Sequence, residues 1–433
     1  MTAPVSTERL STLARSLRSS TILRIAGEVR ALVASGRAIT DLTVGDFSSR
    51  QFRIPSALEQ GIIDALRAGE STYPPPIGMP ALRTAITEFY RQRTKIGAKL
   101  ENVLVASGAR PVIYAVYRAV VDEDETVVFP VPSWNNDHYT QILGARAVTV
   151  ECDAATGFLP TADLLRPHVR SARLIALCSP VNPTGTAFDA ATLSAICDLV
   201  LEENARRRST GERPLYLMYD QVYWMLTARG VVHVDPISLR PEMADYTIIV
   251  DAISKCFAAT GLRVGWTVGP ADVIRAMNDI VGHIGAWAPR PEQVATARFL
   301  ADRSAVDDYM EGMRRDTQRR LDAVYDGLTA LGAQGLPVEC VRPQGAIYVS
   351  ARFGLHGMRD ANGAVIQTDE DIRRYLLDAA GLAAVPFSAF GSSGDHGWFR
   401  LSIGVVSVED IEALMPRIHH ALEALATADT AAG

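Results

Sequence analysis

The sequence predicts an α/β protein with a large, doubly wound, mainly parallel seven-stranded sheet and a smaller α+β domain. Seven short apolar runs, rich in leucine or β-branched residues, recur along the middle of the 433-residue chain, with helical patterns between them. Most are continuous rather than alternating, which is typical of strands covered on both faces, and their alternation with helices favours a parallel sheet. The runs are 103–106, 127–129, 147–150, 174–178, 215–219, 247–250 and 264–268.

Helices are expected before the sheet begins. Apolar residues at helical spacing predict a helix over 20–34. Ser56 and Glu59 form a capping-box pattern, which predicts the start of a second helix. The proline-rich segment 72–78 predicts a loop, and Pro80 is expected to be the first residue of a third helix.

The pattern changes after the sheet. A long helical stretch over 306–331 leads to strand patterns at 346–349 and 399–403, and a final helix is expected from Val408. We therefore expect three regions. An N-terminal arm with part of the small domain covers 1–48, the large ligand-binding domain covers 49–304, and the C-terminal small domain covers 305–433.

Composition excludes several classes of protein. The net charge is -6 and Lys and Arg are spread along the chain, which argues against nucleic acid as a partner. No apolar run reaches the ~18 residues of a membrane span. The five cysteines are scattered and odd in number, which predicts reduced thiols and a cytoplasmic location. The histidines show no metal-ligand spacing, so no metal is expected.

An amine and a guanidinium lie close together near the last two runs. Lys255, preceded by Ser254, follows the run 247–250, and Arg263 comes eight residues later. An amine that loses its proton forms a Schiff base with an aldehyde, and a guanidinium binds a phosphate through two parallel hydrogen bonds. An aldehyde that carries a phosphate is pyridoxal phosphate. The pair is compatible with that cofactor, although a lone pair of this kind is more often two surface charges.

Polar residues follow other runs at the ends where ligands bind in such sheets. Asp220 ends the run 215–219 and Tyr223 follows it, while Asn182 follows 174–178. A carboxylate at this place can pair with a protonated pyridine nitrogen, or it can cap a helix. The amide of Asn182 can donate to a phenolate or carboxylate, or it can belong to a plain Asn-Pro turn.

Three further segments fit a cavity that binds an anionic, flat ligand. The segment 107–110, Ser-Gly-Ala-Arg, follows the first run and opens a helix, whose N–H groups favour an anion. Trp134 can stack on a heterocycle or belong to the core. Arg400 lies in an apolar strand pattern, so it needs either a structural carboxylate or a bound one.

In this order, these motifs resemble the class I and II aminotransferases, the aspartate aminotransferase-like branch of the fold type I pyridoxal phosphate enzymes. The resemblance extends from about Asp41 to about Ile411. It implies that Lys255 holds the cofactor and moves a proton, that Asp220 pairs with the pyridine nitrogen, and that Tyr223 binds the phenolic oxygen. The other cofactor contacts that it implies are Ser107, Gly108, Ala109, Trp134, Asn182, Ser254, Arg263 and Tyr73 of a neighbouring subunit.

The resemblance also implies how substrates are bound. Arg400 would clamp the α-carboxylate, with Asn182 and the backbone of Gly45 beside it. A second carboxylate could be bound by Arg110, which can also be an ordinary surface residue of a helix; Arg290 and His283 are weaker candidates. Alternatively, aromatic or aliphatic side chains could fit a pocket lined by Trp134, Trp287 and Tyr73.

Three positions depart from the family pattern. Ala252 and Ala288 stand where hydroxyl residues are usual, which implies fewer donors for the phosphate. Phe387 stands where glycine is common.

The function expected is a pyridoxal phosphate-dependent aminotransferase. It would move an amino group between an L-amino acid, with aspartate or glutamate favoured, and a 2-oxo acid by a ping-pong mechanism in a homodimer with shared sites. Aminotransfer to aromatic or branched substrates, and a lyase or decarboxylase on the same scaffold, are the alternatives. A cofactor-binding transcription regulator is disfavoured, because the residues before Gly45 lack the length and the basic charge of a helix-turn-helix module.

Overall fold

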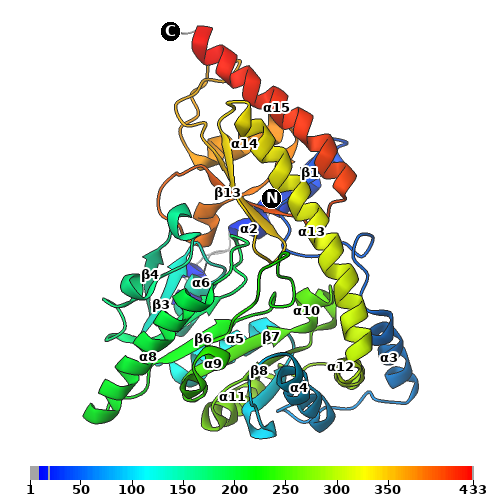
Figure 1. Cartoon of the computed structure of the whole chain (residues 1–433), viewed down its shortest axis with the longest axis vertical. Coiled ribbons are helices and arrows are strands. Elements are labelled where there is room, and N and C mark those ends of the chain that lie inside the picture. Colours follow the sequence, from blue (N-terminus) through cyan, green and yellow to red (C-terminus); the bar gives the residue numbers. More distant parts are fainter. Residues whose placement is uncertain (1–8, 18–19, 432–433) are drawn as a thin grey trace.

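The computed structural model describes residues 9–17 and 20–431, and its largest element is a seven-stranded sheet (Figure 1). The strand order is β2-β8-β7-β6-β5-β3-β4. Strand β8 is antiparallel to both of its neighbours and the remaining pairs are parallel, so the expected mainly parallel sheet is confirmed. The strands are β2 Val103–Ala106, β3 Thr126–Val131, β4 Arg146–Glu151, β5 Ala172–Cys178, β6 Tyr216–Asp220, β7 Thr247–Ala252 and β8 Gly265–Val268.

Helices cover both faces of this sheet, which explains its continuous apolar strands. On β7, Ile248 and Val250 pack into one core with α5 and α11, whereas Ile249 packs into another core with α4, α8 and α12. Each buried aliphatic side chain of this kind contributes roughly 1.5–3 kcal/mol. The helices are α3 Ser56–Arg67, α4 Pro80–Arg93, α5 Ala109–Val120, α8 Ala190–Thr210, α11 Ala271–Ile284 and α12 Arg290–Ala301.

The smaller α+β domain contains a four-stranded antiparallel sheet with the order β12-β13-β10-β9. A separate short pair joins the beginning of the chain to this domain, because β1 is parallel to β11. The long helix α13 runs from the large domain to the small one (Figure 1). The elements are β1 Thr40–Asp41, β9 Val338–Val341, β10 Tyr348–Phe353, β11 Leu382–Ala383, β12 Val385–Pro386, β13 Trp398–Ser402, α13 Arg303–Ala333, α14 Asp369–Ala379 and α15 Val408–Ala431.

Short helices complete the chain. Helix α2 precedes the first strand, and α10 is the single turn that carries Lys255. The α-helices are α1 Thr12–Ser16, α2 Thr21–Ala34, α6 Asn136–Leu143, α7 Ala162–Leu165, α9 Pro236–Leu239 and α10 Ile253–Cys256. The 3₁₀ turns are Leu100–Asn102, Ala154–Thr156, Pro241–Asp245, Thr260–Leu262 and Phe387–Phe390.

One local expectation is wrong, and one expected strand begins two residues later than its pattern. The capping box at Ser56 does not form, because Ser56 is already the first helical residue of α3 and its N-cap is Pro55, without a side-chain bond. Glu59 is instead paired with Arg53 at 3.0 Å. The strand expected at 346–349 begins at Tyr348, because the residue at 346 has a left-handed φ of 58° and cannot continue a strand. The helix that starts at Pro80 is confirmed.

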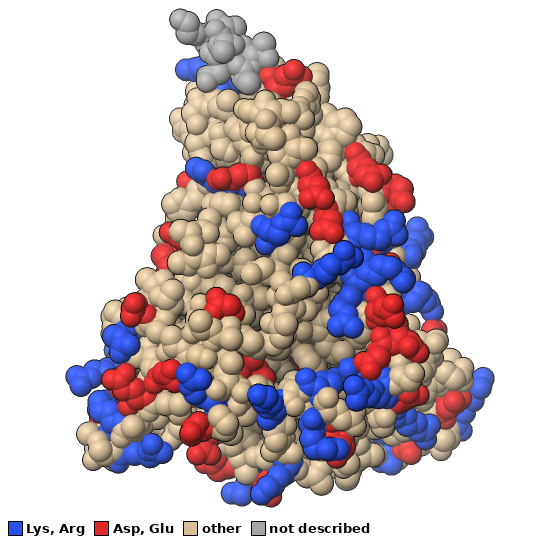
Figure 2. Space-filling model, in the orientation of Figure 1, with Lys and Arg blue, Asp and Glu red and all other residues tan. Residues whose placement is uncertain are grey.

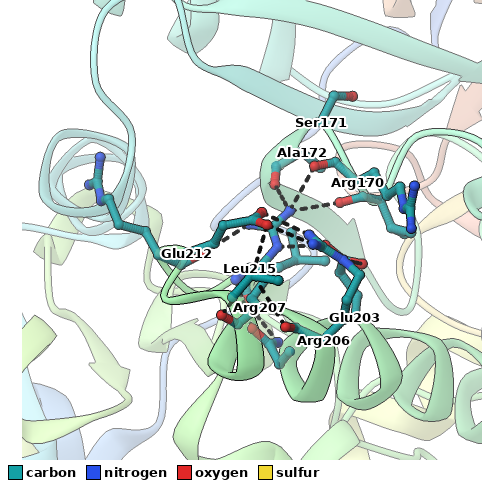
Figure 3. A network of polar contacts seen from close by, with 12 residues as sticks. Arg170, Ser171, Ala172, Glu203, Arg206, Arg207, Glu212 and Leu215 are labelled. Carbon is teal, nitrogen blue, oxygen red and sulfur yellow. Dashed lines mark hydrogen bonds and ion pairs between the residues drawn. The ribbon is translucent and has the colours of Figure 1, made fainter.

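A buried ion-pair network fastens the end of α8 to the beginning of β5 (Figure 3). Glu203 accepts hydrogen bonds from Arg206 and Arg207, which lower the pKa of its carboxyl group. Arg207 also donates to the carbonyl oxygens of Val169 at 2.8 Å and Ala172 at 2.7 Å. Since both buried charges have partners, the network holds α8 against the sheet without leaving an isolated charge in the core.

Charges of both signs are interspersed over the large domain on the face that Figure 2 shows. This distribution fits the modest net charge of -6. Within the part of the chain that the structure describes, no helix has the length and apolar character required to cross a membrane.

Candidate active site

A cavity of about 610 Å³ opens at the carboxyl ends of the parallel strands, between the large sheet and the small domain. Asp220 at the end of β6 and Lys255 after β7 line the side of the cavity that the large sheet forms. Tyr348 and Arg400 enter from β10 and β13 of the small domain, and α2 contributes Arg30. The cavity is large enough for a cofactor and a small substrate together.

Lys255 projects into this cavity from the single turn α10. Its Nζ atom donates a hydrogen bond to the carbonyl oxygen of Gly45 at 2.6 Å. The pKa of the amine is lowered to about 8, chiefly by burial; Arg400 and Arg110 also lower it, while Asp46 and Asp220 act in the opposite direction. A fraction of this amine is therefore unprotonated near neutral pH, which is the form that reacts with an aldehyde.

Gly45 has a steric role beside this amine. A Cβ atom at this position would lie 2.8 Å from the hydroxyl oxygen of Tyr348 and 3.5 Å from Nη1 of Arg400. The backbone can approach both side chains only because glycine has no side chain there.

Asp220 is a half-buried carboxylate that lines the cavity at the end of β6. Its Oδ1 atom accepts a hydrogen bond from the N–H of Val222 at 3.2 Å, and a turn rather than a helix follows, so Asp220 is not a helix N-cap. Burial raises the pKa of this carboxyl group to about 6, while the Val222 N–H and Lys255 act in the opposite direction. A cationic ring nitrogen beside it would stabilise its charged form.

Tyr223 forms a hydrogen bond with Tyr348, a residue that the sequence did not predict to belong to the site. Its hydroxyl group is 2.6 Å from that of Tyr348, and both are buried. Burial raises the pKa of Tyr223 well above its ordinary value, so it is a neutral hydrogen-bonding group. Tyr348 starts a strand 125 residues further along the chain, and nothing in the sequence pattern marks it as a partner.

Arg400 is a buried guanidinium group that has no carboxylate partner among the residues that the structure describes. It donates to Oδ1 of Asn182 at 3.0 Å and to the carbonyl oxygen of Thr43, and it stacks on the ring of Tyr348. Its Nε atom is buried and has no hydrogen-bond partner among residues 9–17 and 20–431. Because an unpaired buried cation is costly, the geometry favours a bound anion here.

A second anion site lies where α5 begins. Gly108, with φ 97°, is the N-cap of α5 and provides no side-chain cap, so the first N–H groups of the helix remain free for a ligand. Arg263 donates to the carbonyl oxygens of Ser107 at 3.0 Å and Thr260 at 2.7 Å. A Cβ atom on Gly108 would collide with the Arg263 guanidinium. The N-terminus of α5 and the guanidinium group of Arg263 therefore lie close together, as the binding of a phosphate requires. Ala109, Ser254 and Arg263 line the cavity.

Arg110 and Trp134 form one wall of the cavity. The guanidinium carbon of Arg110 lies 4.6 Å from the centre of the Trp134 ring, and both residues line the cavity. Within the described ranges, Arg110 has no hydrogen bond or ion pair to another residue, whereas Arg290 is paired with Glu70. Arg110 is therefore the better of the two candidates for a second substrate carboxylate.

Tyr73 is the one expected site residue that lies apart from the rest. It is 82% exposed and packs edge-on against Trp287, with ring centres 5.1 Å apart. Neither residue lines the cavity of its own chain. The departures at Ala252 and Ala288 are both buried and supply no hydroxyl group.

The fold and the cavity together define a class of α/β protein in which an amine of lowered pKa, a half-buried carboxylate and two candidate anion sites face one cavity. Residues 37–418 match the family model of aminotransferase class I and II. The chain belongs to that family, which confirms the resemblance and the expectation of an aminotransferase enzyme.

Known proteins of this family are similar over almost the whole chain. The aspartate aminotransferase of Rhizobium meliloti (strain 1021) is 30% identical over 402 residues, covering 92% of this chain and 93% of the relative. The crystal structure of the Rhizobium meliloti aspartate aminotransferase has a TM-score of 0.86 at 29% identity, covering 96% of this chain and 99% of that one. An aromatic aminotransferase structure from Pyrococcus horikoshii OT3 has a TM-score of 0.78 at 27% identity, covering 91% and 98%.

Proposed function

We propose that this protein is an aminotransferase for amino acids with an acidic side chain, aspartate or glutamate, with a 2-oxo acid as the second substrate. One observation carries the proposal. Two guanidinium groups that have no carboxylate partner in the described part of the chain, Arg400 and Arg110, line the same cavity as Lys255. A dicarboxylic substrate supplies one carboxylate for each of them. The relatives named aspartate aminotransferase support this choice.

We also propose that the cofactor is pyridoxal 5'-phosphate. When bound, it supplies the electron sink that an amino-group transfer requires. The free N–H groups of α5 and the guanidinium of Arg263 would hold its phosphate, and Asp220 would keep its ring nitrogen protonated. Tyr223 and Asn182 would bind its phenolic oxygen, with Trp134 against the ring and Ser107, Gly108, Ala109 and Ser254 around the phosphate.

Lys255 has two tasks in this proposal. Its amine, with a pKa lowered to about 8, would hold the cofactor through its aldehyde and would accept and return a proton at the substrate carbon. The bond to the Gly45 carbonyl orients the Nζ atom toward the cavity. Because both half-reactions use the same amine and the same anion sites, the donor must leave before the acceptor binds, which is a ping-pong sequence.

We propose that the active unit is a homodimer with shared sites. Tyr73 is exposed on its own chain and would complete the phosphate site of the neighbour. The division into 1–48, 49–304 and 305–433 is kept as a proposal, supported by the pairing of β1 with β11; residues 1–8 and 432–433 lie outside the described ranges. The five unpaired cysteines support a reducing compartment such as the cytoplasm.

The substrate proposal is tested with Arg110→Ala, using Arg118→Ala as the matched control because Arg118 is an exposed arginine of the same helix. Half-reactions with single amino acids are followed by the absorbance of the bound cofactor. A charged hydrogen-bonded pair is worth roughly 1.5–3 kcal/mol, so Arg110→Ala should slow aspartate and glutamate about 10- to 150-fold. Alanine and phenylalanine should react as before, and Arg118→Ala should leave all rates unchanged.

Two outcomes contradict the substrate proposal. Equal losses for acidic and apolar substrates would mean that Arg110 only supports the fold. A wild-type protein that does not react with aspartate or glutamate would favour the alternative of aromatic substrates. The similarity to the Pyrococcus horikoshii aromatic aminotransferase and the presence of Trp134 in the cavity would support that alternative.

A further inference from the structure

A buried hydrogen-bond network lies beneath the cavity and is separate from the residues that face it. Its centre is Asp251 on β7, which is 1% exposed. The Oδ2 atom accepts hydrogen bonds from the Tyr90 hydroxyl at 2.7 Å and from Nε1 of Trp224 at 2.9 Å. The Oδ1 atom accepts one from the N–H of Ala252 at 2.7 Å. Three donors therefore surround one carboxylate in the core.

Tyr90 on α4 extends the network across the sheet. Its hydroxyl oxygen accepts a hydrogen bond from Nε1 of Trp266 at 3.0 Å and one from Nε2 of Gln221 at 3.5 Å, in addition to donating to Asp251. Tyr90, Trp266 and Gln221 are all at most 1% exposed. A single phenolic oxygen thus joins α4 to the ends of three strands or the segments beside them.

The network residues are close neighbours in sequence of the candidate site residues. Gln221 directly follows Asp220, and Trp224 directly follows Tyr223. Asp251 precedes Lys255 by four residues, and Trp266 follows Arg263 by three. Three of the segments that present proposed cofactor contacts, 220–224, 251–255 and 263–266, therefore each send at least one side chain into the same network.

We propose that Tyr90 and Asp251 are positioning residues, which hold the segments of Asp220, Tyr223, Lys255 and Arg263 at fixed distances from one another. This inference rests on the proposed function, because it takes those four residues as the cofactor site. A buried polar network that is fully satisfied selects one arrangement of its members, since any shift leaves a donor or acceptor unpaired.

The charge on Asp251 adds a second link to the site. The pKa of Asp251 is raised to about 7, chiefly by burial; the three donors oppose this rise and the neighbouring carboxylate of Asp220 adds to it. The titratable groups that face Asp251 are Tyr90 from α4, Asp220 from β6 and Cys256 from α10. A change in this network should therefore alter the electrostatic environment in which Lys255 titrates.

The test uses Tyr90→Phe, which removes only the central oxygen. Tyr219→Phe is the matched control: Tyr219 is equally buried, lies on β6 and donates to the carbonyl oxygen of Val234 outside the network. The first readout is the pH profile of labelling by a small amine-reactive reagent in the cofactor-free protein, with peptide mass spectrometry. The chain has three lysines, and the exposed Lys95 and Lys99 are internal references.

We expect the labelling midpoint of Lys255, about 8 in the wild type, to shift in Tyr90→Phe by roughly half a pH unit or more, since unpaired buried groups alter the field at the amine. In the cofactor-loaded enzyme, kcat should fall about 10- to 100-fold with KM changed far less, because small misplacements of reacting groups cost that much. Tyr219→Phe should lose similar thermal stability and change neither readout.

A Tyr90→Phe protein with a wild-type labelling midpoint and wild-type kcat would overturn the proposal, because the network would then be structural only. If Tyr90→Phe does not fold, the test uses Trp224→Phe instead, because this substitution removes one donor to Asp251 and keeps an aromatic ring. The labelling midpoint of Lys255 and kcat then decide in the same way whether the network positions the site. A wild type that makes no covalent bond to pyridoxal phosphate through Lys255 would refute the proposed function itself, so the two failures are distinguishable.

Discussion

The Nζ atom of Lys255 donates a hydrogen bond to the carbonyl oxygen of Gly45, at 2.6 Å and across 210 residues of sequence. This bond connects the turn that follows β7 of the large sheet with the segment that follows β1, which is paired with the small domain. The reactive amine is therefore held by two parts of the chain at once. Any movement that separates these parts changes the position of the amine.

Lys255→Ala should abolish covalent attachment of pyridoxal phosphate and reduce turnover to background. The reason is that Lys255 alone among the three lysines lies in the cavity, while Lys95 and Lys99 are exposed. Reduction with borohydride followed by peptide mass spectrometry measures the attachment. The double variant of Lys95 and Lys99 to Ala is the control and should retain it; activity in Lys255→Ala near the wild-type rate would refute the assignment.

Asp220→Asn should stabilise the cofactor-free protein above pH 6. The pKa of Asp220 is raised from 3.8 to about 6, so the folded state binds a proton more tightly than the unfolded state. The contribution of this carboxyl group is complete below pH 4 and is lost as the pH rises to 6, by about 3 kcal/mol at most. Thermal unfolding of both proteins from pH 4 to pH 8 measures the difference, and parallel curves would contradict the expectation. With cofactor, the same variant should lose activity by orders of magnitude.

Arg400→Lys should slow every amino acid substrate, acidic or apolar, about 100-fold in kcat/KM. Lysine keeps the charge but loses the planar pair of donors that fits a carboxylate. Steady-state kinetics with aspartate, alanine and phenylalanine provide the measurement. Arg352→Lys, at an exposed arginine of β10, is the control and should have no effect. A loss confined to aspartate would mean that Arg400 binds the side-chain carboxylate instead.

Mixing Tyr73→Ala with Lys255→Ala should restore activity if the sites are shared between subunits. In a mixed dimer, one site has the wild-type residue at both positions, so random mixing should give about 25% of wild-type activity. Each variant alone should have little activity, and the mixed sample is assayed after joint refolding. An active monomer in dilute solution, seen by sedimentation, would contradict the dimer.

Much of the site could be predicted from the sequence because strand ends in a doubly wound sheet converge. Asp220, Lys255 and Arg263 each follow or precede an apolar run, and the parallel topology brings those ends to one edge. The capping box at Ser56 was a local pattern too, yet it did not form, because the helix began one residue earlier than the pattern requires.

Tertiary structure alone decided which distant side chains complete this site. Tyr348 meets Tyr223 across 125 residues, and Tyr90 meets Asp251 across 161. Apolar periodicity and strand ends are local properties that the chain carries in its order, and they determined the fold and the edge where the ligand binds. A hydrogen bond between remote segments requires its two atoms to be placed to within about a few tenths of an ångström, which happens only when the segments are packed against each other in the folded chain.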